Sequence, residues 1–177
     1  MVWTKRKHFY QNLFAHPKIY RRKILFNLVG CMAFNGKMLP RVYFTAPNIH
    51  NDANLTITIN HDVLSHWSCN LPEVLYLQLD NTCHENKNQI VFGYLNMFVE
   101  MKIFQKGKVG FLLIGHTHDH IDQMFSCFLV ILRRKEVGSL PSLIECIKKS
   151  YIPKLVFHDG RIPTSFLLNV TKKQLNI

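Results

Sequence analysis

The sequence predicts a mixed α/β fold, and three segments in the middle of the chain carry this prediction. Residues 74–79 and 109–114 are apolar runs without alternation, which is typical of strands that are buried on both faces. Residues 89–101, which lie between them, are apolar almost all round and therefore predict a buried helix. A strand, a helix and a strand in this order form a right-handed crossover, which brings both strand ends to one edge of the sheet.

The first part of the chain predicts a hairpin and then a helix. The Asn-Gly pair at 35–36 separates two strand-like segments, 24–34 and 38–45, and Asn-Gly is a strong signal for a tight antiparallel turn. Asn51 or Asp52 can cap a following helix in which apolar residues recur at every fourth position. The same segment contains a β-branched run, so a strand remains an alternative there.

The last part of the chain predicts two more helices and a tail. Residues 121–132 place apolar side chains on one helical face, and the three basic residues that follow suit a helix C-terminus. A short helix is predicted from Pro141 to about Ser150, and the segment beyond Tyr151 is loop-like. We expect a basic N-terminal segment at 1–23, a core at 24–137, and a C-terminal helix with a loop-like tail at 138–177.

Basic residues outnumber acidic residues two to one. The chain of 177 residues has 22 Lys and Arg against 11 Asp and Glu, a net charge of +11, and no acid precedes Asp52. Such a field attracts polyanions, of which nucleic acid is the commonest in cells, although a basic protein without such a partner explains the charge equally well. The residues that we expect to contact DNA are Lys5, Arg6, Lys7, Arg21, Arg22, Lys23, Arg133, Arg134 and Lys135.

The cysteines and the hydropathy of the sequence indicate the cellular compartment in which the protein resides. Five cysteines without a CxxC pair argue against a disulfide framework and a zinc ribbon, and for a reducing compartment. No secretory signal is visible, and the longest apolar run, near 125–132, is too short to span a bilayer. We therefore expect an intracellular protein without a membrane partner. The nucleus is favoured over the cytoplasm, and the oligomeric state is left open.

Polar side chains gather where the two apolar strands end. Asp80 directly follows the first strand, and Glu85 and several asparagines lie shortly after it. A carboxylate in this company is a candidate ligand for Mg²⁺, which prefers one or two carboxylates together with water, whereas a turn or a helix cap is the commonest role of such an Asp. Asp122 follows the second strand by about one helical turn. Asp80, Asp122 and His116 would share one crevice, an arrangement that suits metal-assisted phosphoryl transfer.

The histidines after the second strand allow a different kind of metal site. Gly-His-Thr-His at 115–118 resembles the last metal motif of calcineurin-like phosphoesterases, but their upstream motifs are absent from the sequence. The segment 116–120 also resembles the zinc motif of metallo-β-lactamases, although it is one residue short. A metallohydrolase that binds zinc or manganese at His116, His118 and His120 is therefore the alternative function. For His118 and His120, a role in lining a polar loop is favoured.

Taken in order, the two motifs have a more specific resemblance. Asp80-Asn81 with Asn-Lys-Asn at 86–88, followed by Gly-His-Thr at 115–117 and Asp122, resembles a widespread eukaryotic family of uncharacterised domains. Members of that family are similar to the ribonuclease-H-like catalytic core of transposases, and the resemblance runs from about Gln11 to Leu155.

The resemblance implies both a fold and a chemistry. It implies a ribonuclease-H-like mixed sheet flanked by helices, and an ancestral Mg²⁺- or Mn²⁺-dependent cleavage and strand transfer of DNA. Asp80 and Asp122 would be the metal ligands, with His116 and Glu85 as further catalytic candidates. We expect the carboxylates of Asp80 and Asp122 to lie roughly within 8 Å of each other.

The sequence departs from this family at its beginning. Ribonuclease-H-like nucleases also hold their metals with a carboxylate on the first strand, which would lie just upstream of Gln11, but residues 1–10 contain no acid. We therefore expect the first strand to be missing or degenerate, in a core that is truncated or decayed at this end. Asp52 and Asp62 are the nearest substitutes, on or beside a helix that should lie away from the strand ends. The prediction is a DNA-associated domain without metal-dependent nicking activity.

Overall fold

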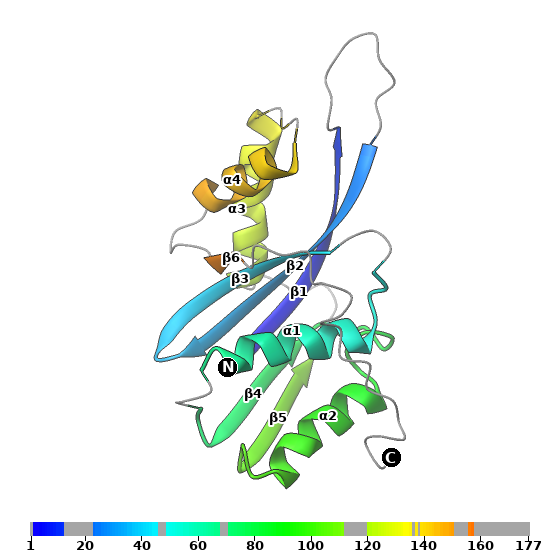
Figure 1. The fold of residues 1–177 in the computed structure, drawn as a ribbon, viewed down its shortest axis with the longest axis vertical. Coiled ribbons are helices and arrows are strands. Elements are labelled where there is room, and N and C mark those ends of the chain that lie inside the picture. Colours follow the sequence, from blue (N-terminus) through cyan, green and yellow to red (C-terminus); the bar gives the residue numbers. More distant parts are fainter. Residues whose placement is uncertain are drawn as a thin grey trace.

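The protein consists of a six-stranded sheet with helices on both faces (Figure 1). The computed structural model describes residues 2–12, 23–45, 49–67, 71–111, 120–135, 137, 139–150 and 156–157. The strands are β1 (Val2–Asn12), β2 (Lys23–Asn35), β3 (Lys37–Thr45), β4 (Val74–Leu79), β5 (Lys106–Phe111) and β6 (Val156–Phe157). The helices are α1 (Ala53–Ser65), α2 (Gln89–Glu100), α3 (His120–Arg134) and α4 (Leu140–Ser150). The mixed α/β class predicted from the sequence is confirmed.

The sheet is mixed, with antiparallel pairing in its middle and parallel pairing on both sides, where β6 pairs parallel with β3. Its strand order is β5-β4-β1-β2-β3-β6. β1, β2 and β3 pair antiparallel, whereas β4 pairs parallel with both β1 and β5. The crossover from β4 through α2 to β5 therefore forms as predicted, and the carboxyl ends of β4 and β5 lie at one edge of the sheet.

The expectation of a missing or degenerate first strand was wrong. Residues 2–12 form β1, which lies in the middle of the sheet and pairs with β2 over eleven residues. The expectation rested on the absence of an acid, but a strand requires pairing partners and residues with a high β-propensity. The segment supplies these residues in Val2, Trp3, Thr4, Phe9 and Tyr10. The basic N-terminal segment at 1–23 thus contains the central strand.

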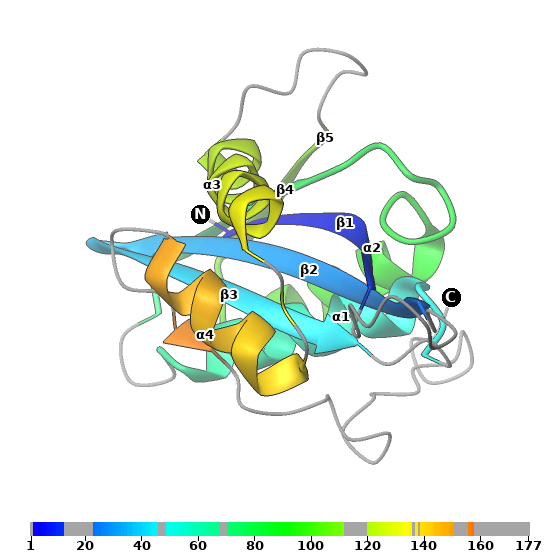
Figure 2. The same ribbon diagram turned by 90° about the horizontal axis from the view of Figure 1, so that it is seen from above.

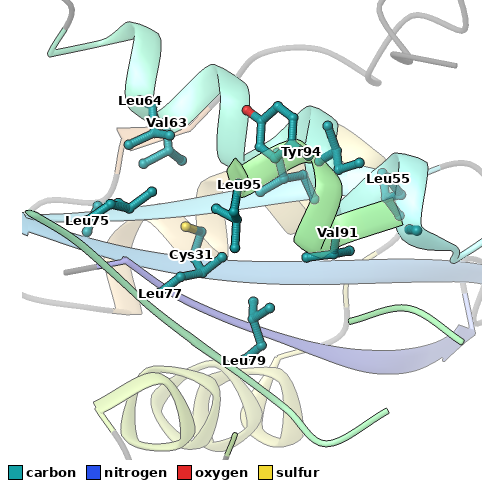
Figure 3. Packing of buried hydrophobic residues seen from close by; sticks show 14 of the residues in the cluster. Cys31, Leu55, Val63, Leu64, Leu75, Leu77, Leu79, Val91, Tyr94 and Leu95 are labelled. Atoms are coloured by element: carbon teal, nitrogen blue, oxygen red, sulfur yellow. The ribbon is translucent and has the colours of Figure 1, made fainter. Parts of the chain in front are cut away.

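Two clusters of buried apolar residues lie on opposite faces of the sheet. The first cluster joins α1 and α2 to one face, where Leu75, Leu77 and Leu79 of β4 lie under both helices (Figure 3). The second joins α3 and α4 to the other face. Residues of β2 alternate between the two clusters as a strand requires, with Val29 in the first and Leu28 in the second. Figure 2 shows α3 on the opposite side of the sheet from α1 and α2.

A glycine permits the close approach of α3 to β2. A Cβ atom at Gly30 would lie 2.8 Å from Cε of Met124 and 2.9 Å from Cε2 of Phe125, which is closer than real Cβ contacts. Both partners are fully buried residues of α3. Gly30 therefore sets the distance between this helix and the sheet.

Most of the remaining predicted elements agree with the structure. Gly36 has a φ of 74° in the β2–β3 turn, and Asp52 caps α1, so the helix reading of that segment was right. α2, α3 and α4 agree with the predicted helices to within a few residues. β5 begins at Lys106, three residues before the predicted start, and β6 was not predicted. None of the helices in the described part of the chain has the length and apolar character that a membrane crossing requires.

Candidate functional site at the carboxyl end of β4

Asp80 lies at the carboxyl end of β4, next to the central strand. β1 pairs with β4 at Val2↔Leu77 and Trp3↔Gln78. This pairing ends two residues before Asp80. β1, the strand beside β4, contains no acid.

The loop that follows β4 holds one oxygen of Asp80 in place. Oδ1 accepts hydrogen bonds from the main-chain nitrogen of Thr82 at 3.3 Å, from the hydroxyl of Thr82, and from the side-chain amide of Asn86. Asn86 is buried, and its Oδ1 accepts a hydrogen bond from the hydroxyl of Thr56 on α1 at 3.0 Å. Asn86 therefore links Asp80 to the helix that covers the first cluster.

Asn88 closes the same loop from its other end. Its Oδ1 accepts hydrogen bonds from the main-chain nitrogens of Ile90 and Val91, both at 3.1 Å, and so caps α2. Its Nδ2 donates to the main-chain oxygens of Cys83 and His84, at 3.2 and 3.1 Å. The Asn-Lys-Asn motif thus fixes the loop through Asn86 and Asn88.

The surroundings of Asp80 leave its negative charge uncompensated by the residues that the structure describes. Its recorded partners are hydroxyl and amide groups, which are neutral, and they all bind Oδ1. A half-buried carboxylate held in this way can accept a hydrated cation at Oδ2. However, no group of three His, Cys, Asp or Glu side chains suited to a metal occurs within the described ranges. Glu85 lies half-buried in the same loop.

The second predicted motif is only partly within the described residues. His116 and His118 lie outside them, as does most of the segment between β5 and α3. His120 begins α3 and is exposed, and Asp122 is the acid in the first turn of that helix. The main-chain oxygen of Asp122 accepts a hydrogen bond from the hydroxyl of Ser126 at 2.7 Å. The proximity of Asp122 to Asp80 and the histidine metal site both stay predictions.

The predicted DNA-contacting residues fall in three places. Lys5, Arg6 and Lys7 belong to the central strand, and Lys23 begins β2. Arg21 and Arg22 lie outside the described residues. The remaining three, Arg133, Arg134 and Lys135, are exposed at the C-terminal end of α3.

The sequence analysis missed a buried polar cluster on the opposite face from α3. Arg41 of β3 forms an ion pair with Asp62 of α1, with 2.5 Å between Nη1 and Oδ2, and Tyr43 donates a hydrogen bond to the same oxygen at 2.7 Å. Cys31 lies beside them, and burial raises the pKa of its thiol; burial likewise raises the pKa of Tyr43. An arginine within a predicted strand was the available signal, because a buried arginine requires an acidic partner.

Comparisons with known proteins give one match. The chain matches the model of a family described as a domain of unknown function, DUF7869, over residues 18–165. No curated protein and no solved structure matches the chain. Because the match spans most of the 177 residues, including the loop of Asp80 and the segment that leads to Asp122, the chain belongs to the DUF7869 family.

Proposed function

We propose that this protein is a nucleic-acid-associated domain with a ribonuclease-H-like core, derived from a transposase that cleaved DNA with Mg²⁺ or Mn²⁺, and that it no longer cleaves DNA. One observation carries the proposal. Asp80 lies at the carboxyl end of β4, beside a central first strand that has no carboxylate.

The arrangement of the sheet supports the first part of the proposal. A mixed sheet flanked by helices is the architecture that the resemblance implies, and β1, the first strand in the chain, is also the central one. β4 lies beside it, so a carboxylate at the start of β1 would lie close to the end of β4 that leads to Asp80. The ancestral site would have used this pair.

The residues now present support the loss of cleavage. Two-metal catalysis needs several carboxylates to hold both ions, and β1 supplies none. The two acids named as substitutes have other roles, because Asp52 caps α1 and Asp62 pairs with Arg41. Neither is available at the end of β4.

The positive net charge of the protein supports association with nucleic acid. The net charge is +11, and the basic residues Arg133, Arg134 and Lys135 are exposed at the end of α3. Lysines and arginines that contact phosphates release counterions, and the binding therefore weakens steeply as salt is raised.

Binding to duplex DNA can be tested by fluorescence anisotropy over a range of salt concentrations. We expect strong salt dependence and little sequence preference. The triple variant Arg133→Ala/Arg134→Ala/Lys135→Ala should reduce the slope of log affinity against log salt by about 0.9 for each lost phosphate contact. Lys149→Ala is the matched control, because Lys149 already pairs with Glu145 at 2.5 Å. Binding that does not change between low and physiological salt would contradict the proposal.

The loss of cleavage can be tested with supercoiled plasmid DNA. We expect no nicking by the purified protein with Mg²⁺ or with Mn²⁺. Metal-dependent nicking that disappears in Asp80→Ala would show that the site is still active and would overturn this part of the proposal. Nicking that persists in Asp80→Ala would instead come from a contaminating nuclease.

A further inference from the structure

In the part of the chain that the structure describes, helices cover only one half of the face of the sheet that carries α3 and α4. The second apolar cluster takes Leu28 and Met32 from β2 and Val42 and Phe44 from β3, but no residue from β4 or β5. α3 packs on β1 and β2. The β4–β5 half of this face therefore has no covering helix among the described residues.

The pairing of the two strands shows which side chains lie on the uncovered half. Leu75, Leu77 and Leu79 are buried in the first cluster, so the alternate residues of β4 lie on the opposite face. Their partners on β5 lie beside them, as in the pairs Tyr76↔Lys108 and Gln78↔Gly110. We call this surface the open β4–β5 face; its residues are Val74, Tyr76, Gln78, Lys106, Lys108 and Gly110.

The open β4–β5 face combines an exposed aromatic ring with cations. Tyr76 is 41% exposed, which is unusual for a large side chain in the middle of a sheet strand. Nζ of Lys108 lies 4.8 Å from the centre of its ring and donates a hydrogen bond to its hydroxyl at 3.1 Å. Lys106 is also exposed, and a Cβ atom at Gly110 would meet no atom within 4 Å. The six residues include no acid.

We propose that the open β4–β5 face binds single-stranded nucleic acid, with a base stacked on Tyr76 and phosphates at Lys106 and Lys108. A flat sheet surface with an exposed aromatic ring and nearby lysines accepts unpaired bases, whose faces are hidden in a duplex. The two lysines and the absence of acids match a polyanion, and the aromatic ring favours nucleic acid over an acidic peptide. This inference rests on the proposed association with nucleic acid. It adds that the nucleic acid is single-stranded and that it binds at the open β4–β5 face.

The contact between Lys108 and Tyr76 does not prevent stacking. An exposed cation–π pair contributes little, so the flexible lysine can leave the ring and contact a phosphate when a base arrives. The bound strand would also pass the end of β4, because Tyr76 and Gln78 lead along this face towards Leu79, which Asp80 directly follows. A stacked strand would thus pass the carboxylate that the ancestral reaction used.

The test measures the anisotropy of short fluorescein-labelled oligothymidylate and oligouridylate in parallel with a duplex. Tyr76→Ala should weaken binding to single strands by about fivefold or more, the loss expected for one stacked base, and leave duplex binding unchanged. Tyr76→Phe keeps the ring and should bind like the unchanged protein. The matched control is Phe92→Ala, because Phe92 is also 41% exposed but lies on α2, which covers the opposite face of the sheet.

A second variant tests the phosphate contacts. Lys106→Ala/Lys108→Ala should reduce the salt slope for the single strand by about 1.4, or about 0.7 for each phosphate, whereas Lys37→Ala at the hairpin should leave it unchanged. If the protein binds duplex DNA but Tyr76→Ala does not affect single strands, the present inference fails and the proposed function survives. If it binds neither form of nucleic acid, both fail. Equal affinities for the two oligonucleotides would mean that the face does not distinguish DNA from RNA, as stacking predicts.

Discussion

Two aspartates on different parts of the sheet have opposite surroundings. Asp62 lies between α1 and β3, where an arginine that is only 5% exposed and a tyrosine hydroxyl both contact its Oδ2. Asp80 lies at the end of β4, where hydroxyl and amide donors contact its Oδ1 and no cation contacts it among the side chains that the structure describes. The charge of Asp62 is neutralised inside the protein, whereas the charge of Asp80 remains available to an external cation.

The difference separates a structural carboxylate from a candidate functional one. A carboxylate that stabilises a fold is paired with a cation, because an unpaired charge in a buried position is costly. A carboxylate that served as a metal ligand is held by neutral donors, which fix its position without cancelling its charge. Substitution should therefore lower the free energy of unfolding much more at Asp62 than at Asp80.

The largest effect is expected at Asp62. Asp62→Ala leaves the buried guanidinium of Arg41 without its partner, so the free energy of unfolding should fall by about 3 kcal/mol or more. Urea denaturation monitored by circular dichroism measures this change. The control is Glu145→Ala, which breaks an ion pair of the same 2.5 Å length whose side chains are 65 to 68% exposed. That variant should lose far less stability, and equal losses would show that burial does not determine the value of these pairs.

The next largest effect is expected at Asn86. Asn86→Ala removes the amide that contacts Asp80, together with the acceptor of the Thr56 hydroxyl. The free energy of unfolding should fall by about 2 kcal/mol, because polar groups in a buried place lose their partners. Asn81→Ala is a suitable control, since Asn81 is exposed in the same loop. If Asn86→Ala is as stable as the control, the loop does not depend on this asparagine.

Alkaline pH should weaken the cluster around Asp62 and leave the loop of Asp80 unaffected. The thiol of Cys31 has a pKa raised by burial above its ordinary value of 9.0, so it keeps its proton in the folded protein while the unfolded chain releases it. The folded state then binds more protons, and stability falls as pH rises above 9.0, by about 1.4 kcal/mol per pH unit for this group.

The pH effect is measured as the urea midpoint at several values between neutral pH and pH about 10.5, within the alkaline range set by the thiol. Cys31→Ala should show a shallower decline, although its stability at neutral pH is lower. Cys83→Ala removes an exposed cysteine in the loop of Asp80 and should decline as steeply as the unchanged protein. A decline that Cys31→Ala does not alter would assign the effect to other groups, such as Tyr43 and Tyr94, whose pKa values are also raised by burial.

The smallest effect is expected for Asp80→Asn. The substituted side chain keeps an oxygen that can accept the hydrogen bonds of Thr82 and Asn86, and no cation loses its partner among the described residues. The free energy of unfolding should change by less than about 0.5 kcal/mol. Asp62→Asn should cost clearly more, because Arg41 then faces a neutral group. Equal costs would remove the distinction between the two aspartates.

The sequence predicted the elements whose signals are local. The β2–β3 turn, the cap of α1 and the apolar character of β4 and α2 each follow from a few neighbouring residues. It failed at β1, because the absence of an acid from residues 1–10 was taken to mean that the first strand is missing or degenerate. A central position is set by pairing with β2 and β4, which a local pattern does not contain.

The sequence predicted the position of Asp80 in the candidate site but not the contacts around it. Asp80 was placed correctly at a strand end, because a polar cluster after an apolar run marks that place. The link from Asn86 to α1 was not foreseen, since a hydrogen bond from this loop to a distant helix depends on how the helix packs. The pairing of Arg41 with Asp62 has the same origin, because the two residues lie 21 positions apart on different elements.

The place of β1 has a consequence for how the chain folds. β1 can pair with β2 early, but its pairing with β4 joins Val2 to Leu77, positions 75 residues apart in the chain. Such distant contacts form slowly, because a long loop must close before they contribute. Until β4 arrives, the antiparallel strands present an unpaired edge on β1, and such an edge invites association with other chains. Aggregation during folding should therefore depend on how fast β4 docks, more than on the final stability of the protein.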